Sequence, residues 1–312
     1  MKIKGQVYQS TGSYYSVKDT EGNFWRARLK GRFKISKHTS SSNPIAVGDW
    51  VQMEALKNEE KEAVISDIVD RDNYIIRTSP QNRHHKHIIA SNLDLACLVI
   101  TVTQPVTSFG FIDRFLITTE VSNIPCVLII NKSDLITQEN ESDFHRILDI
   151  YKKIGYEIHI VSAKNGEGID KLEEKLFDKN SLFTGHSGVG KTTLINRLIP
   201  GFQLKTKSVS EWSGKGQHTT TFAEMFDWPN KLNTAIVDTP GIKEWGLQEV
   251  ERSNLSHFFP EMLALLPSCR FNNCLHVNEP HCAIKDALKN GEIAQERYSN
   301  YILFLEELER PF

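Results

Sequence analysis

No run of apolar residues in this 312-residue sequence approaches the roughly 20 residues needed to span a bilayer. The longest such runs lie near residues 95–102 and 124–130. Residues 1–5 lack the apolar core of a secretory signal. From these absences, and from the chain length, we expect a cytoplasmic protein of two or three domains, without a membrane partner.

Cysteine is scarce, and its five residues are an odd number. Cys97 and Cys126 lie in strand-like apolar runs, which is typical of inert core cysteines. The other three gather near residue 275 beside histidines. An odd, clustered set in an intracellular chain favours a metal site over disulfides.

The chain also lacks a strong excess of charge, since its formal net charge is −2. Residues 1–40 differ, because nine Lys/Arg face only Asp19 and Glu21 there. A local excess of +7 in a near-neutral chain points to a polyanionic partner for one domain.

Residues 1–70 read as short strands separated by polar turns, with candidates at 5–10, 14–18, 24–29, 50–56 and 62–68. Five such strands predict a small barrel resembling the OB-fold. The two-residue period places Arg26, Arg28 and Lys30 on one face of the third strand, where they could contact RNA phosphates. The alternative is an ordinary solvated strand face.

A phosphate-binding loop follows the apolar residues 182–184 and precedes a helical pattern at 193–199. It fits G-x-x-x-x-G-K-[ST], with Thr193 as the next residue. Its residues are Gly185, His186, Ser187, Gly188, Val189, Gly190, Lys191 and Thr192. Backbone N–H groups of such a loop cradle phosphates, Lys191 would reach the β- and γ-phosphates, and Thr192 would bind Mg²⁺.

Two further segments resemble the guanine-reading motifs of GTPases, and both follow buried strands. The first contains Asn131, Lys132, Ser133 and Asp134, and the second contains Ser162, Ala163 and Lys164. The Asp134 carboxylate would accept hydrogen bonds from guanine N1–H and its 2-amino group. Asn131 would tie this loop to the phosphate loop, Lys132 would cover the base, and a backbone N–H of 162–164 would meet the guanine oxygen.

After the phosphate loop, residues 216–221 resemble a switch I segment, and residues 238–241 match the D-x-x-G pattern. Thr220 and Asp238 would help to hold Mg²⁺, and the Gly241 N–H would meet the γ-phosphate. Since the base-reading motifs precede the phosphate loop, the order is circularly permuted. Nucleotide loops need only meet at one edge of a doubly wound sheet.

Residues 71–90 read as a linker, solvated and facing RNA, although its histidines could also bind a metal. Residues 249–266 have helical apolar spacing, as do 283–290 and 294–309. Between them lie four ligand types that suit tetrahedral Zn²⁺: Cys269, Cys274, His276 and Cys282. His281 is an alternative imidazole. Four protein ligands predict a structural rather than a catalytic site.

A basic barrel, a permuted GTPase and a C-x4-C-x-H-x5-C tail closely resemble the ribosome small-subunit-dependent GTPases of the RsgA type. The resemblance implies a multidomain α/β protein: an OB-like domain at 1–70, a permuted GTPase domain at 71–245 and a helical zinc domain at 246–312. It further implies GTP and Mg²⁺ as ligands, rRNA binding, and GTPase activity stimulated by the small subunit during late maturation. Thr192 and Thr193 stand where many relatives carry serines, and a threonine hydroxyl can still bind Mg²⁺.

The residue after D-x-x-G is Ile242, where many GTPases carry a glutamine that orients the attacking water. His218, beside Thr219–Thr221, is the candidate to replace it; alternatively it packs in switch I or touches rRNA. Two other function classes remain: a GTP-gated RNA-binding module with little hydrolysis, and a trafficking GTPase. The basic barrel and the lack of a lipidation site argue against the latter.

Overall fold

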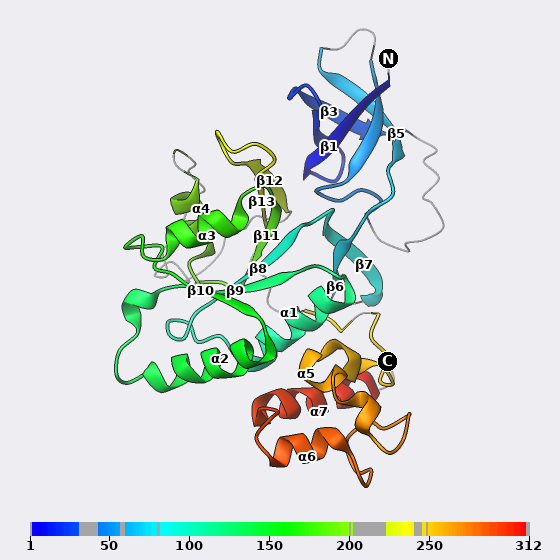
Figure 1. The fold of residues 1–312 in the computed structure, drawn as a ribbon. Helices are drawn as coiled ribbons and strands as arrows, with labels where there is room; N and C mark the ends of the chain where they lie inside the picture. Colours follow the sequence, from blue (N-terminus) through cyan, green and yellow to red (C-terminus); the bar gives the residue numbers. More distant parts are fainter. Residues whose placement is uncertain are drawn as a thin grey trace.

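The computed structural model describes residues 2–30, 43–56, 60–79, 82–199, 201, 223–239, 245–247 and 249–309. The chain forms three parts (Figure 1): an N-terminal barrel, a central sheet with helices, and a C-terminal group of helices that packs below α1. Within the described residues, no helix is both long and apolar enough to cross a bilayer.

The N-terminal part is a closed five-stranded barrel. Its strands are β1 (Lys2–Ser10), β2 (Tyr15–Asp19), β3 (Phe24–Leu29), β4 (Trp50–Ala55) and β5 (Glu62–Ile68). Pairing runs β1–β2–β3–β5–β4 and returns from β4 to β1, so the sheet closes on itself. Buried apolar residues such as Val7, Val17, Met53 and Ile65 fill the interior. The predicted OB-like barrel is therefore confirmed.

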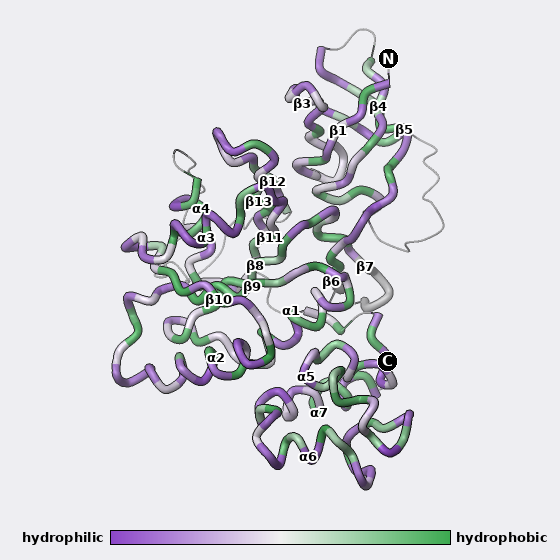
Figure 2. The backbone as a smooth tube through the Cα atoms, viewed as in Figure 1, coloured by the Kyte–Doolittle hydropathy of each residue, from purple (hydrophilic) through white to green (hydrophobic). Residues whose placement is uncertain are grey.

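The central sheet has the order β10–β9–β8–β11–β13–β12. Its strands are β8 (Leu95–Ile100), β9 (Cys126–Ile130), β10 (Glu157–Ile160), β11 (Asn180–Thr184), β12 (Glu224–Asp227) and β13 (Ala235–Asp238). All neighbours are parallel except β12 with β13. In Figure 2 the tube is largely hydrophobic through the middle of this sheet, as expected for strands covered on both faces.

Helices cover both faces of the central sheet. They are α1 (Phe109–Val121), α2 (Glu141–Ile154), α3 (Ile169–Leu176) and α4 (Lys191–Leu198), with a short turn η1 at Ser133–Leu135. Phe115 of α1 and Ile147 of α2 belong to the apolar cluster on one face, whereas Leu172 of α3 and Leu194 of α4 belong to the cluster on the other. This is the predicted doubly wound arrangement.

The predicted linker at 71–90 is wrong. Strands β6 (Tyr74–Ser79) and β7 (Asn82–Ser91) form an antiparallel hairpin. Ile75 and Ile88 are fully buried in it, and Ala90 pairs with Val47 of the barrel segment. Residues 82–87 of β7 are polar and only residues 88–90 are apolar, so the sequence pattern conceals this strand.

The barrel and the central sheet are joined at one edge. Gln9 of β1 pairs with Glu224 of β12. The Tyr8 hydroxyl donates to the Asp227 carboxylate at 2.5 Å, and Lys18 lies 2.6 Å from the same carboxylate. The strand that follows the predicted switch I segment is therefore the strand on which the barrel docks.

The C-terminal part consists of η2 (Leu255–Phe258), α5 (Pro260–Leu263), η3 (Leu266–Ser268), α6 (Ala283–Lys289) and α7 (Gln295–Glu309). The helical apolar spacing of 249–266 gives short elements here and no continuous helix. Pro260 begins α5, and Pro267 lies in the first turn of η3. Helices α6 and α7 match the expected positions. Ile117 of α1 shares a buried apolar cluster with Phe259 and Tyr301, so this part packs on the central domain.

Candidate functional site

The phosphate loop connects β11 to α4 at the carboxyl edge of the sheet, and two glycines explain its path. A Cβ on Gly185 would lie 2.5 Å from the Val99 carbonyl oxygen. Gly190 has a φ of +85°, and a Cβ there would lie 2.5 Å from Asn131 Nδ2. Other residues would push the loop away from the sheet and from the base-reading loop. Ser187 and Gly188, at the middle of the loop, are exposed.

Lys191 and Asp238 contact each other directly beneath this loop, and both are at most 9% exposed. Lys191 begins α4, while Asp238 ends β13. Burial raises the pKa of the Asp238 carboxyl, and the Lys191 ammonium opposes that shift. Lys191, which is predicted to bind phosphate, and Asp238, which is predicted to help hold Mg²⁺, are thus in direct contact.

The two other α4 residues named from sequence take different positions. Thr192 is half-buried in the first turn, next to Lys191, and Thr193 is exposed. His218, Thr219, Thr220, Thr221, Gly241 and Ile242 lie outside the described residues.

The base-reading loops meet at Asn131, which is 2% exposed. Its Nδ2 donates to the Val189 carbonyl at 2.8 Å, and its Oδ1 accepts from the Ala163 N–H at 3.0 Å. One side chain therefore holds both base-reading loops against the phosphate loop. The Ala163 N–H, one of the amides predicted to meet the guanine oxygen, thus donates to Asn131 in this structure.

Asp134 lies beside this junction, and its side chain is about one-tenth exposed. The Ser162 hydroxyl donates to its Oδ1 at 2.6 Å, and Lys164 lies 3.8 Å from its Oδ2. These contacts fix the carboxylate plane while leaving lone pairs for a ligand. Ser133 donates to Glu167 at 2.9 Å, so it supports the loop from outside.

Lys132 bridges two loops rather than pointing into solvent. Its ammonium donates to the Gly188 carbonyl at 2.7 Å and also to the Gln104 carbonyl. Burial lowers the pKa of Lys132, and Asp134 opposes that shift. The side chain of Lys132 therefore reaches from the base-reading loop to the phosphate loop.

The loop between β8 and α1 was not predicted to belong to the site, yet it contacts the phosphate loop. The Thr107 hydroxyl lies 2.7 Å from His186 Nε2, and the His186 ring packs edge-on against Phe111 of α1. Burial lowers the pKa of His186, which favours the neutral imidazole. The position of this loop could have been predicted from the sequence. It follows a buried parallel strand, so it lies at the same carboxyl edge of the sheet as the phosphate loop.

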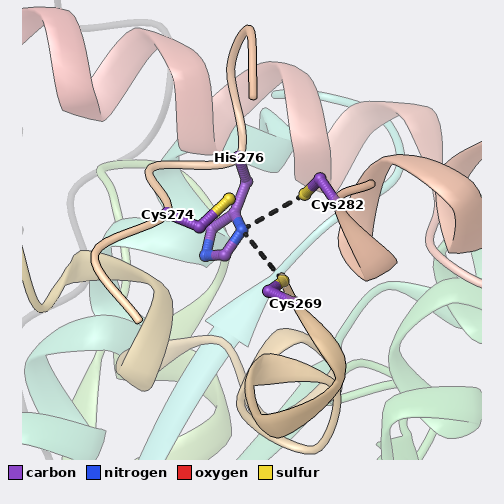
Figure 3. A group of neighbouring side chains, drawn as sticks. All are labelled: Cys269, Cys274, His276 and Cys282. Atoms are coloured by element: carbon purple, nitrogen blue, oxygen red, sulfur yellow. Dashed lines mark hydrogen bonds between the residues drawn. The ribbon is translucent and has the colours of Figure 1, made fainter. Parts of the chain in front are cut away.

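A second site lies in the C-terminal part, where Cys269, Cys274, His276 and Cys282 come together (Figure 3). Their ligand atoms all lie within 4.8 Å of one another. His276 Nδ1 is 3.7 Å from the Cys269 sulfur and 3.4 Å from the Cys282 sulfur. A tetrahedral zinc site requires about 3.5 Å between such atoms, from its Zn–S and Zn–N bond lengths. The donor set and its spacing fit a metal ion.

The backbone around His276 is held by groups outside the cluster. Tyr298 donates to the His276 carbonyl at 2.7 Å, and Tyr301 donates to the Leu275 carbonyl at 2.9 Å. The Glu279 carboxylate accepts from the N–H groups of Leu275 and Val277.

Cys97, by contrast with the clustered cysteines, is buried in the central sheet, where burial raises the pKa of its thiol and keeps it protonated.

Comparison with known families decides the identity of the fold. Residues 68–248 match the RsgA GTPase family model, and residues 4–65 match the RsgA N-terminal domain. The chain belongs to the RsgA GTPase family. The predicted family and the GTP-hydrolysing class of enzyme are thereby confirmed.

Several RsgA relatives resemble the chain over nearly its whole length. The small ribosomal subunit biogenesis GTPase RsgA of Christiangramia forsetii is 46% identical over 305 residues, covering 97% of this chain and 96% of the relative. That of Flavobacterium johnsoniae is 48% identical over 307 residues, covering 97% and 93%.

Two solved structures share the architecture. YjeQ from Thermotoga maritima superposes with a TM-score of 0.77 at 33% identity, covering all of both chains. YloQ, described as a circularly permuted GTPase, gives 0.72 at 27% identity, covering all of this chain and 97% of the other.

Proposed function

We propose that this chain hydrolyses GTP in the pocket around Asn131 and Lys191 while it acts on the small ribosomal subunit late in maturation. The subunit stimulates that hydrolysis. The relatives support the substrate and the partner, because they are small ribosomal subunit biogenesis GTPases. The observation that carries the proposal is the double hydrogen bond of Asn131, which joins the base-reading loops to the phosphate loop.

In the proposed pocket, Asp134 selects guanine and Lys132 covers one face of the base. Lys191 binds the β- and γ-phosphates, and Mg²⁺ is held by Thr192, Asp238 and Thr220 of switch I. Lys191 and Asp238, which contact each other here, would then each bind one part of the Mg²⁺–GTP complex.

His218 is proposed to orient the attacking water, since Ile242 cannot form a hydrogen bond. Support comes from its place in the sequence beside Thr219–Thr221. In its alternative roles His218 packs in switch I or touches rRNA.

The proposed domain boundaries are 1–70 for the rRNA-binding barrel, 71–245 for the GTPase domain and 246–312 for the zinc domain. The exposed residues Arg26, Arg28 and Lys30 support an RNA contact on the barrel. The Cys3His cluster supports one structural Zn²⁺. We further propose that the chain acts in the cytoplasm, where ribosomal subunits mature, and that it acts as a monomer.

Single-turnover hydrolysis of GTP, with and without saturating small subunits, tests this function against a GTP-gated RNA-binding module. We expect the wild type to hydrolyse bound GTP when subunits are present. His218→Ala should keep GTP affinity but lose roughly a hundredfold in subunit-stimulated rate, as expected for a positioned acid–base group. Intact GTP throughout the subunit-bound lifetime of the wild type would favour the non-hydrolysing module.

A further inference from the structure

The loop that joins β8 to α1 is held in shape by its own hydrogen bonds. The Thr101 hydroxyl donates to the Pro105 carbonyl at 2.5 Å. The Thr107 N–H donates to the Thr101 carbonyl at 2.9 Å, and the Thr107 hydroxyl accepts from the Thr101 N–H at 3.0 Å. Thr101 is 0% exposed and Thr107 is 4% exposed. Residues 101–107 therefore form a compact, internally bonded loop, which we call the brace.

The brace contacts the first half of the phosphate loop at two points. The Thr107 hydroxyl lies 2.7 Å from His186 Nε2. A Cβ on Gly188 would lie 3.3 Å from Pro105 Cδ, so the proline ring lies directly against this glycine. The residue after Gly188 is held from elsewhere, because its carbonyl accepts from Asn131. The brace and Asn131 thus hold consecutive parts of the phosphate loop.

Lys132 connects the brace to the base-reading loop. Its ammonium donates to the Gly188 carbonyl at 2.7 Å and to the Gln104 carbonyl of the brace. The brace therefore supports two groups at once: the lysine that is expected to cover the base, and the loop that is expected to bind the phosphates.

The hydrogen bonds of His186 define one tautomer of its ring. Nδ1 lies 3.3 Å from the Ser187 carbonyl oxygen, which can only accept, so Nδ1 carries the proton. Nε2 is then an acceptor, and the Thr107 hydroxyl donates to it. The same ring packs edge-on against Phe111 of α1. The orientation of His186 is thus set by Thr107 on one side and by α1 on the other.

We propose that Thr107 is a positioning residue for nucleotide binding, because through His186 it holds residues 186–188 in the path that binds the phosphates of GTP. The inference rests on the GTP pocket proposed above and adds the brace to it. Backbone N–H groups bind phosphate when they point at one anion, and a loop already held in that path loses less entropy on binding. Thr107 acts through His186 and not by contact with the nucleotide.

The test measures the affinity of the full-length chain for GDP and for a non-hydrolysable GTP analogue, both with Mg²⁺. Thr107→Val keeps the shape of the side chain but leaves His186 Nε2 without its donor. It should weaken both nucleotides by roughly tenfold, the expected loss for one buried hydrogen bond. Thr107→Ser restores the hydroxyl and should recover most of the affinity. Thr103→Val, the same change in the same loop but outside this contact, is the matched control and should bind like the wild type.

Two further measurements separate positioning from a general loss of stability. Because Thr107 and His186 act as one unit, Thr107→Val combined with His186→Ala should weaken GDP binding no more than the stronger single change does. In subunit-stimulated turnover, Thr107→Val should raise the KM for GTP and leave kcat nearly unchanged, as expected when the ground state and the transition state lose the same binding.

Wild-type affinity in Thr107→Val, an equal loss in Thr107→Ser, or additive losses in the double variant would each overturn the positioning role. A fall in kcat with an unchanged KM would overturn it as well. The proposed function fails separately. If the wild type does not hydrolyse GTP with small subunits, that function is overturned, while the GDP affinities of the variants still decide the role of Thr107.

Discussion

Asn131 Nδ2 and the Val189 carbonyl oxygen lie 2.8 Å apart although 58 residues separate them in sequence. In this permuted chain the base-reading motif comes first and the phosphate loop later, so this hydrogen bond closes the pocket across the permutation. Gly190 makes the approach possible, because any Cβ there would collide with Asn131 Nδ2.

Asp134→Asn should weaken GTP binding about ten- to a hundredfold, the expected loss for charge-assisted hydrogen bonds. The same change should favour xanthosine triphosphate, since xanthine has a carbonyl where guanine has an amino donor. Competition binding with GTP, ATP and XTP measures the effect. Asp143→Asn, an exposed carboxylate at the start of α2, is the control. If Asp134→Asn keeps the wild-type preference for GTP over XTP and ATP, residues 131–134 do not recognise the base.

Metal removal should unfold the C-terminal part while GTP binding persists, because the Cys3His cluster lies apart from the nucleotide loops. Elemental analysis should find about one Zn²⁺ per chain. Cys274→Ser should lose the metal, whereas Cys126→Ala, outside the cluster, should retain it. A metal-free chain whose C-terminal helices remain protected from proteolysis would contradict a structural zinc site.

Arg297→Met should destabilise the docking of α7 on the central domain by roughly 3–5 kcal/mol, because it leaves buried carboxylates unpaired. Arg297 is 1% exposed and lies 2.7 Å from both Asp113 and Glu261. Arg252→Met is the matched control, since Arg252 pairs with Glu309 at an exposed position and should cost no more than about 1 kcal/mol. Equal losses in denaturant unfolding would show that the buried network does not hold α7.

The barrel should lose stability in acid through Asp19. Burial alone would raise the pKa of Asp19, but hydrogen bonds from Trp25 and Asn23 lower it below the ordinary value of 3.8. A depressed carboxyl pKa stabilises the fold above the unfolded value and loses that contribution as pH falls through the folded value.

Unfolding of wild type and Asp19→Asn between pH 7 and pH 2 measures this contribution. The difference in unfolding free energy between wild type and Asp19→Asn should become smaller below about pH 4. Asp70→Asn, on an exposed carboxylate, is the control. A gap that stays constant across this range would assign the effect of Asp19→Asn to packing instead.

The sequence located the nucleotide loops because each motif follows a buried strand and needs particular residue types. Gly185 allows a close approach of the backbone to β8, Lys191 supplies a cation for phosphate, and Asp238 supplies a buried carboxylate. The Cys3His cluster could be read for the same reason, since its ligand types and its short spacing restrict the geometry.

Tertiary context determines what the sequence did not reveal. Residues 81–87 are polar, yet Ile75 packs into the large core of the central domain, and Ile88 packs into a small cluster against Tyr74. These contacts turn an apparent linker into a hairpin. The apolar spacing of 249–266 is helical, but Pro260 interrupts it. The Thr107–His186 contact joins two polar loops that have no periodicity, so only the assembled sheet edge brings them together.

GTP turnover by the full chain with isolated small or large ribosomal subunits tests the central claim most directly. The account predicts slow turnover alone, stimulation by small subunits of at least about a hundredfold, as partner-activated GTPases show, and none by large subunits. Lys191→Ala should abolish the stimulated rate. If GTP turnover is equally fast with small subunits, with large subunits and without subunits, the small subunit does not activate this pocket and the account is contradicted.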